Sequence, residues 1–212
     1  MTNDQSDYCT DRPFRPRRAP GREHFDRATV HAILDDGYVV HAAFQGAHGP
    51  EIIPVFYVRD GERVLIHLSA KAGLSMALKR GEAVTLAVTH VDGLILARSA
   101  FHHSMNYRSV IVHGRAVELA GEEKAHALDL MVEKVEEGRS EKVRRADPQE
   151  MKATAVFAVP LEQVAAKQRT GGPKDDPEDM SLPVWAGTVP LALTRGSPIR
   201  DLSAETDTVL SE

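Results

Sequence analysis

Residues 51–69, EIIPVFYVRDGERVLIHLS, carry the strongest structural signal in the chain. Two runs rich in β-branched and aromatic residues, 51–59 and 63–69, lie on either side of Asp60-Gly61. An Asp-Gly pair between such runs is a strong short-range sign of a β-hairpin, because glycine accepts the positive φ that a tight turn needs. The stretch therefore predicts two antiparallel strands joined by a tight turn.

Runs rich in β-branched and aromatic residues also occur on both sides of this hairpin. A second Asp-Gly pair, Asp92-Gly93, is expected to close another hairpin. Strands that follow one another without long helices between them are typical of an antiparallel barrel, so the chain is expected to be mainly β with a few helices. The runs expected to form strands are 38–44, 51–59, 63–69, 83–91, 94–100, 108–119, 153–160, 163–169 and 184–193.

Apolar residues recur at helical spacing in three stretches, 26–36, 72–80 and 121–137. The first is expected to bury Val30, Ile33 and Leu34. The third is expected to bury Ala125, Leu128, Met131, Val132 and Val135. Residues 138–148 are charged and predict a solvated connection, while 170–180 are rich in turn residues and carboxylates and predict a loop.

Both ends of the chain differ from its centre. Residues 1–22 alternate arginine with proline, which predicts a flexible extended arm. This arm is either a clamp on a partner subunit or an anionic ligand, or a mobile tail. The folded domain is expected to span residues 23–195, followed by a polar tail at 196–212.

Composition excludes several functional classes. The 212 residues, 42% of them hydrophobic and with a net charge of -5, suit one globular domain. The acidic balance argues against nucleic acid as a partner, and the absence of a long apolar run or a secretory signal argues for a cytoplasmic protein outside the membrane. One cysteine, Cys9, permits no disulfide framework, and none of the ten histidines has metal-ligand spacing, so no metal is expected.

Polar groups at strand ends are the candidates for chemistry. His67, Ser69 and Lys71 leave a strand just before a short helix, and an imidazole, a hydroxyl and an ammonium together suit a phosphate monoester. Tyr107-Arg108-Ser109 begins a later strand. Taken singly, such residues are also ordinary turn and cap residues. The lone Trp185 is either a core or interface residue or a ring that stacks beside a planar cofactor.

Four stretches carry a resemblance to a known family. They are residues 67–73 (HLSAKAG), 107–116 (YRSVIVHGRA), 167–173 (KQRTGGP) and 183–191 (PVWAGTVPL). In this order they resemble the pyridoxamine 5'-phosphate oxidase-like superfamily of FMN-binding split β-barrels, and within it the branch similar to nitroimidazole-resistance proteins. The resemblance implies an antiparallel split barrel that forms a homodimer with FMN at the subunit interface.

The resemblance also implies which residues meet the cofactor. A strand would run past the flavin ring, a turn would hold the phosphate, and Arg169 and Trp185 would come from the second subunit. The implied FMN-binding residues are Pro54, Val55, Phe56, His67, Leu68, Ser69, Lys71, Arg108, Ser109, Arg169 and Trp185.

The resemblance favours an FMN-dependent oxidoreductase that acts on a small planar or nitro-type acceptor. Residues 189–193, Val-Pro-Leu-Ala-Leu, lack the Arg and His that true pyridoxamine-phosphate oxidases carry there, so vitamin B6 oxidation is not expected. His67, followed by His41, is the candidate acid or base, and the alternative is an imidazole that only packs. The alternative functions are a flavin- or haem-binding module without turnover and a member that uses the deazaflavin F420.

Overall fold

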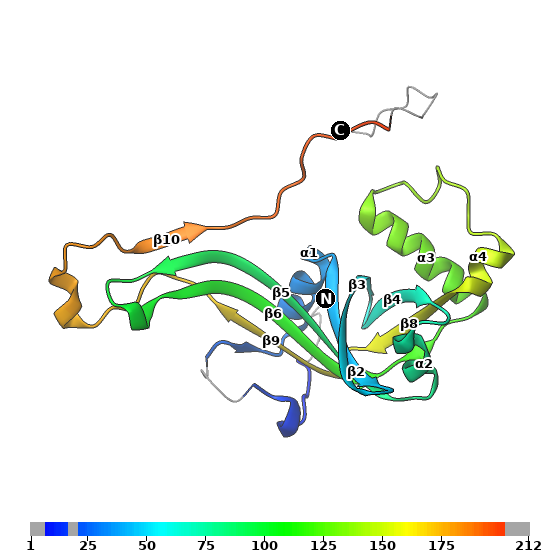
Figure 1. Ribbon diagram of the computed structural model, residues 1–212, viewed down its shortest axis with the longest axis horizontal. Coiled ribbons are helices and arrows are strands. Elements are labelled where there is room, and N and C mark those ends of the chain that lie inside the picture. The colour runs from blue at the N-terminus through cyan, green and yellow to red at the C-terminus, as the bar shows by residue number, and fades with distance from the viewer. Residues whose placement is uncertain (1–6, 17–20, 202–212) are drawn as a thin grey trace, which may run out of the picture.

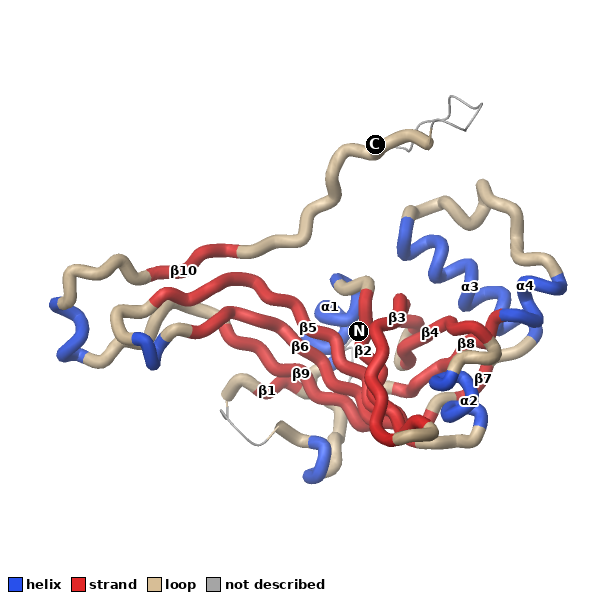
Figure 2. Tube along the Cα trace, viewed as in Figure 1, coloured by secondary structure: helices blue, strands red, loops and turns tan. Residues whose placement is uncertain are grey.

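A computed structural model describes residues 7–16 and 21–201. Within these residues ten strands pair into one antiparallel sheet, which curls on itself as a split barrel (Figures 1 and 2). The fold class expected from the sequence is therefore confirmed. The strands are β1 (Glu23–His24), β2 (Val39–Gly46), β3 (Gly49–Asp60), β4 (Arg63–Ser69), β5 (Ala83–Leu96), β6 (Ser104–Arg115), β7 (Val117–Glu118), β8 (Thr154–Pro160), β9 (Gln163–Arg169) and β10 (Gly187–Pro190).

The strand order across the sheet is β1-β9-β6-β5-β2-β3-β4-β8-β7, and β10 pairs with β5. The predicted hairpin of β3 and β4 is confirmed, with Asp60 opposite Arg63 and Gly61 in the left-handed region at φ +54°. Its local turn signal and its apolar alternation agree, which explains why this part of the fold is predictable from sequence.

The helices are α1 (Arg27–Asp36), α2 (Gly73–Lys79), α3 (Gly121–Val135) and α4 (Pro148–Ala153). Helix α1 buries Val30, Ile33 and Leu34 as predicted, and Asp26 caps it by accepting a hydrogen bond from the amide of Thr29. Helix α4 was not predicted, although Asp147 and Glu150 form a capping box at its start. Short 3-10 helices occur at Arg12–Phe14 (η1), Ala100–His102 (η2) and Pro177–Ser181 (η3).

Helix α3 confirms part of the expected stripe, since Met131 is buried and Leu128 packs against the core. Ala127 and Met131 are its buried residues, whereas Val135 is exposed at the last turn. Leu128 and Leu130 also pack there, against a second core cluster between the sheet and α3. The helix meets only one part of the sheet, so its contact stripe is narrower and slightly rotated relative to the apolar pattern.

The second Asp-Gly pair does not form a turn, contrary to the sequence prediction. Strand β5 continues through Asp92-Gly93, and the register with β6 shifts between Val91 and Gly93 as in a β-bulge. Gly93 lies against β10, and a Cβ atom there would come within 3.0 Å of the carbonyl oxygen of Val189. The pair therefore allows close approach of a third strand.

Beyond this bulge β5 and β6 leave the barrel as a long hairpin. We use the name hairpin extension for residues 91–106 together with 170–190, which include η2, η3 and β10. It projects from the body of the molecule in Figure 1. The last strand is shorter than expected, Gly187–Pro190 instead of 184–193.

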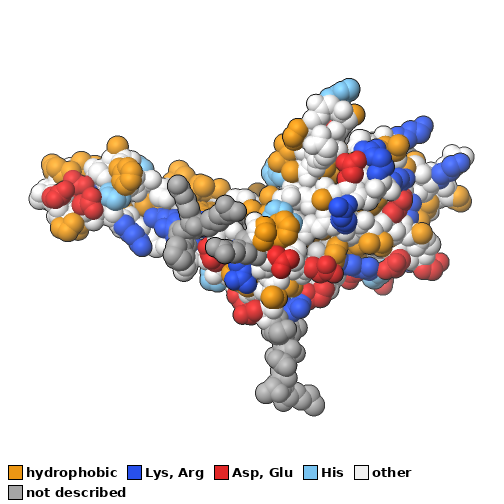
Figure 3. Space-filling model, turned by 90° about the horizontal axis from the view of Figure 1, so that it is seen from below, with side chains coloured by type: hydrophobic (Ala, Val, Ile, Leu, Met, Phe, Trp, Pro, Cys, Tyr) orange, Lys and Arg blue, Asp and Glu red, His pale blue; other side chains and the backbone are white. Residues whose placement is uncertain are grey.

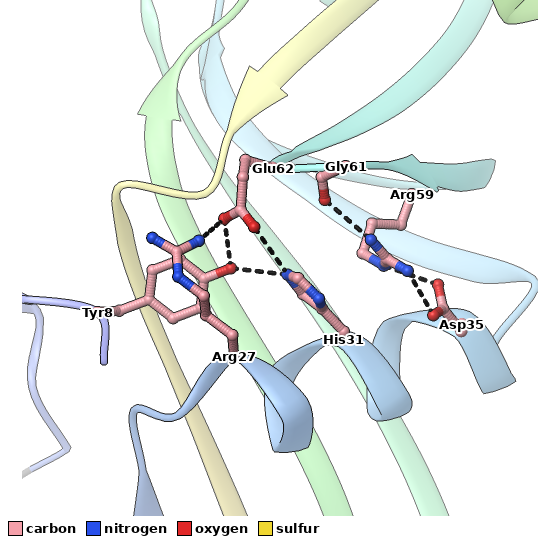
Figure 4. Close-up of polar contacts among 7 residues, drawn as sticks. All are labelled: Tyr8, Arg27, His31, Asp35, Arg59, Gly61 and Glu62. Atoms are coloured by element: carbon pink, nitrogen blue, oxygen red, sulfur yellow. Dashed lines mark hydrogen bonds and ion pairs between the residues drawn. The ribbon is translucent and has the colours of Figure 1, made fainter. Parts of the chain in front are cut away.

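The described part of the N-terminal segment, residues 7–16, packs against the barrel, unlike the expected extended arm. Tyr8 is buried, and its hydroxyl donates to Glu62 at 2.7 Å and lies 2.9 Å from Nε2 of His31 (Figure 4). Arg27 also pairs with Glu62 and lies over the Tyr8 ring. A single aromatic residue between polar neighbours gave no periodic signal, which is why this contact was missed. Residues 17–20 of the expected arm lie outside the described part of the chain.

Candidate functional site

An aromatic row lies beside the hairpin of β3 and β4. The rings of Tyr38 and Phe56 are stacked, with centroids 6.5 Å apart and an angle of 21° between planes. Phe56 then meets the imidazole of His67 edge-on at 6.5 Å. These three rings, none of them fully buried, form an aromatic surface against which a planar ligand can pack.

His67 is the polar end of this row. The His67 residue is exposed, and none of the described residues makes a hydrogen bond with its imidazole ring. Partial removal of the imidazole from water lowers the pKa of His67, because burial disfavours the charged form. This favours the neutral imidazole, which has one donor and one acceptor nitrogen.

The turn between β4 and α2 presents the predicted phosphate-binding residues. Leu68 is buried and holds the end of β4, while the carbonyl oxygen of Ser69 accepts hydrogen bonds from the amide of Ala72 at 3.0 Å and from Ser75 Oγ at 2.7 Å. The Ser69 hydroxyl and the Lys71 ammonium are left at the surface. Lys71 has no ion pair within the described residues, so the turn offers a hydroxyl and a cation to an anion.

Residues 54–56 lie along β3 next to this turn. Pro54 is exposed and faces His41 across the β2–β3 pair, and Val55 is half-buried against the core. Neighbouring side chains on a strand point to opposite faces, so Val55 anchors the strand while Pro54 meets solvent. Phe56 is the member of this group that belongs to the aromatic row.

Arg108 has a different set of partners from the expected phosphate. Its guanidinium donates to both carboxylate oxygens of Asp92, from Nε at 2.9 Å and from Nη2 at 2.8 Å, and Nη1 lies 2.9 Å from Asp36. The hydrogen bond with Asp92 is the main reason that the pKa of Arg108 is raised. The contact with Asp36 raises this pKa further. Two carboxylates within the chain thus already neutralise this arginine.

Arg108 lines a cavity of about 910 Å³. The other lining groups come from the end of α1, from β5, from α3 and from the segment 191–195. Within the cavity, Nε2 of His90 lies 3.0 Å from the carbonyl oxygen of Ile33. At the rim, Nη1 of Arg195 lies 2.9 Å from Oε2 of Glu136. Tyr38 belongs both to this cavity and to the aromatic row, so the two features form one continuous surface.

The remaining predicted residues lie around β6, β9 and the hairpin extension. The Ser109 hydroxyl donates to the carbonyl oxygen of Lys167 at 3.3 Å. Arg169 is only 7% exposed and donates to Asn106 Oδ1 at 2.6 Å, so it fixes the base of the extension. Trp185 is 63% exposed near the far end of the extension, where its ring covers Gly187.

Within one chain the structure brings together only part of the predicted site. Pro54, Val55, Phe56, His67, Leu68, Ser69 and Lys71 share the β3–β4 region. Arg108, Ser109 and Arg169 lie on β6 and β9, and β5 and β2 separate those strands from β3 and β4. Lys71, Arg108 and Arg169 therefore do not converge on one phosphate within a single copy.

Sequence reasoning missed four residues of this surface: Asp36, Tyr38, His90 and Asp92. Tyr38 had been placed only at the start of a strand, and Asp92 had been interpreted as a turn residue. The one available signal was an acidic residue within a β-rich run, which needs a cation on the neighbouring strand. Arg108 is that cation, but it can be recognised as the partner only when the register of β5 and β6 is known.

Among residues 7–16 and 21–201, no group of three or more His, Cys, Asp or Glu side chains could hold a metal ion. No helix in that part of the chain is long and apolar enough to span a membrane.

Comparison with known proteins places this geometry in context. A model of the pyridoxamine 5'-phosphate oxidase family matches residues 26–168. None of the curated proteins matches the chain. A 5-nitroimidazole resistance protein homologue from Bacteroides thetaiotaomicron is 19% identical, with a TM-score of 0.57 over 68% of this chain and 84% of that chain, a likeness that shows the fold alone.

Two solved structures are similar over nearly their whole length. The flavocytochrome Anf3 from Azotobacter vinelandii is 33% identical, with a TM-score of 0.89 over 95% of this chain and 94% of that chain. A FAD- and haem-binding protein from Mycobacterium smegmatis is 28% identical, with a TM-score of 0.85 over 90% of this chain and 94% of that chain.

Proposed function

The chain belongs to the pyridoxamine 5'-phosphate oxidase family, and we propose on this basis that it is a flavin-binding redox protein. The observation that carries the proposal is the 33% identity to a flavocytochrome over 95% of the chain. Because function resides in a site and not in a fold, the site residues must also suit a flavin.

The side chains of the β3–β4 region suit a flavin. Lys71 and Ser69 offer a cation and a hydroxyl for its phosphate, and the row of Tyr38, Phe56 and His67 offers an aromatic surface for its ring system. Pro54 occupies an exposed position on β3 and is uncharged, so it adds no competing charge there. We assign the phosphate to Lys71 and not to Arg108, since Asp36 and Asp92 already neutralise Arg108.

We further propose that two copies form a homodimer that completes the site. Trp185 is 63% exposed and Phe101 is 89% exposed, and both belong to the hairpin extension. Figure 3 shows hydrophobic side chains on the surface of this extension. Large exposed apolar surfaces on a monomer mark interaction sites. A second copy would cover this surface and would bring Trp185 to the flavin, as the sequence resemblance implies.

When bound, the flavin supplies hydride or electron transfer. The chain then binds and orients it, and His67 holds or moves a proton at an imidazole nitrogen. A small planar or nitro-type compound is the proposed acceptor, because aromatic rings such as those of Tyr38 and Phe56 favour contact with other flat molecules. Vitamin B6 oxidation is not proposed, since residues 189–193 lack Arg and His.

Haem is a second candidate ligand. The observation that favours it is that both structures similar over nearly their whole length are named for flavin and haem together, as a flavocytochrome and as a FAD- and haem-binding protein. Imidazole is a common axial ligand of haem iron. His67 and His41 are exposed imidazoles within the described residues that could serve.

The absorbance spectrum of the purified protein tests both proposals. Flavin bands that bleach on reduction support the first, and a Soret band supports the second. Released cofactor identifies FMN, which the sequence favours, or FAD, which the similar structures favour. A colourless protein that takes up neither FMN nor FAD would overturn the flavin proposal, and light scattering that gives a monomer would overturn the dimer.

A further inference from the structure

A second cavity, of about 550 Å³, lies between the N-terminal segment and the outer face of β6 and β9. Its size is within the usual range for small-molecule sites. We call it the N-terminal pocket and define it by Phe14, Arg15, Ser109, Ile111, His113 and Lys167. It is separate from the cavity at Arg108, because successive β6 side chains point to opposite faces of the sheet.

The floor of this pocket is set by strand register. Ser109 lies opposite Lys167, and Ile111 lies opposite Ala165, so these side chains share one face. The intervening Val110 and Val112 are buried in the core. Ile111 is nevertheless 40% exposed, so an apolar part of the sheet is left open beneath the segment.

The wall of the pocket is held firmly in place. The amide of Asp11 donates to Gln163 Oε1 at 2.7 Å, and Gln163 Nε2 donates back to Asp11 Oδ2 at 2.8 Å. Thr10 is buried and donates to the carbonyl oxygen of Val164. Phe14 packs on the ring of His113 with centroids 4.7 Å apart, and its own ring is 39% exposed.

Positive charge lines the pocket. Among the described lining residues Arg15 and Lys167 are the charged ones, and both are cations. Arg15 donates from Nε to the carbonyl oxygen of Thr10 at 2.7 Å and lies over the Phe25 ring, and within the described residues it has no ion pair with an acidic side chain. Glu23 lies opposite Lys167 across the β1–β9 pair. In a chain of net charge -5, a pocket whose described charged lining residues are both cations favours an anion.

We propose that the N-terminal pocket binds a small aromatic phosphate of the nucleoside monophosphate class. Arg15 pairs with the phosphate, Lys167 adds positive charge beside it, and the side chains of Phe14 and Ile111 cover the flat base. The ligand is a free nucleotide, because the adenylate half of FAD is joined to the flavin phosphate, which we assign to Lys71, and β5 and β2 separate β6 and β9 from that region.

Isothermal titration with AMP tests the proposal on two forms of the full-length protein, flavin-free and FMN-loaded. AMP is expected to bind, and adenosine and inorganic phosphate to bind about tenfold more weakly, because each lacks one half of the contacts. Failure of AMP to bind either form would overturn the proposal. Because the flavin-free protein is titrated as well, the AMP titration can be interpreted even if the protein binds no flavin.

Variants locate the binding. Arg15→Ala is expected to weaken AMP about tenfold, Arg15→Lys to retain most of the affinity, and Arg144→Ala, which changes an exposed arginine of the 138–148 connection, to change nothing. Phe14→Leu should weaken AMP but leave inorganic phosphate unchanged. Glu23→Gln should strengthen AMP, because it removes the negative charge opposite Lys167. Equal AMP affinity in Arg15→Ala, Phe14→Leu and the parent protein would contradict the assignment.

Titration of FAD-loaded protein gives a further check. AMP is expected to bind the FMN-loaded and the FAD-loaded forms equally, because the adenylate half of FAD stays beside the flavin phosphate at Lys71. Exclusion of AMP from the FAD-loaded form alone would contradict the assignment to a free nucleotide.

Discussion

Arg108 on β6 holds Asp92 on β5 by two parallel hydrogen bonds, from Nε at 2.9 Å and from Nη2 at 2.8 Å. Asp92 is the extra residue of the bulge at which the hairpin extension leaves the barrel. A bidentate pair at that point fixes the orientation of the carboxylate, and with it the direction of the bend. The arginine that the sequence placed on a cofactor phosphate therefore stabilises the shape of the chain.

Asp92→Asn should lower the free energy of unfolding by about 1 kcal/mol, because it replaces a charge-assisted pair that is about one-third exposed. Urea denaturation measures the change. The matched control is Asp129→Asn, which breaks the more exposed pair with Arg145 and should cost less than about 0.5 kcal/mol. Equal effects of the two substitutions would show that the bulge does not depend on this pair.

Gly93→Ala should destabilise the protein by about 1–3 kcal/mol. The added Cβ would lie 3.0 Å from the carbonyl oxygen of Val189, a backbone atom of β10 that cannot move without breaking the β5–β10 pairing. Gly172→Ala is the control, since a Cβ there meets nothing within 4 Å. Thermal unfolding and Trp185 fluorescence report the loss of β10, and an unshifted midpoint in both variants would exclude the close approach.

The sequence predicted best where the signal is local. The β3–β4 hairpin and the buried face of α1 follow from a turn pair and from apolar spacing, and both were found as expected. Asp92-Gly93 has the same two residues as Asp60-Gly61 but forms a bulge instead of a turn, because β10 pairs with β5 there from almost a hundred residues away. No local pattern carries that pairing.

The candidate site shows the same division. His67, Ser69 and Lys71 were found because they follow one another at the end of one strand. Their aromatic neighbours Tyr38 and Phe56 come from other strands, and which of their faces meet depends on the register of the sheet.

Tyr8→Phe should cost about 1 kcal/mol at pH 7, because it removes the hydrogen bond to Glu62. Burial raises the pKa of Glu62, but hydrogen bonds from Tyr8 and Arg27 outweigh this and leave the pKa below its ordinary value of 4.5. A carboxylate of this kind stabilises the fold above its unfolded pKa, and the contribution is lost as the pH falls through the folded pKa.

The difference between the parent protein and Tyr8→Phe should therefore be full at pH 7 and should shrink below pH 4.5. Urea denaturation at a series of pH values measures it. Tyr107→Phe is the control, since the Tyr107 hydroxyl makes no hydrogen bond within the described residues. A difference that stays constant down to pH 3 would contradict the role given to Glu62.

His67 should titrate below 6.5, because burial lowers its pKa. A base with a depressed folded pKa gains protons more readily when unfolded, so its contribution to stability is present above 6.5 and is lost as the pH falls. NMR titration of the imidazole measures this directly. Phe56→Leu, which removes the ring at its edge, should move the pKa upward, and Phe101→Leu on the hairpin extension should not. Titration at 6.5 or above in the parent protein would contradict the assignment.

Lys71→Gln should weaken flavin binding about tenfold, because it removes the exposed ammonium of the β4–α2 turn. Lys79→Gln is matched to it in chemistry and lies on the adjoining helix, but Lys79 pairs with Glu118 at 3.2 Å, so flavin affinity should stay unchanged. Arg108→Gln completes the comparison: with Asp36 and Asp92 left uncompensated, it should lower stability while leaving flavin affinity within about twofold of the parent protein. Fluorescence quenching of added FMN and FAD measures all three. The reverse pattern, with Arg108→Gln abolishing binding and Lys71→Gln harmless, would move the phosphate to the cavity at Arg108, because only a ligand able to displace two carboxylates could make that arginine essential.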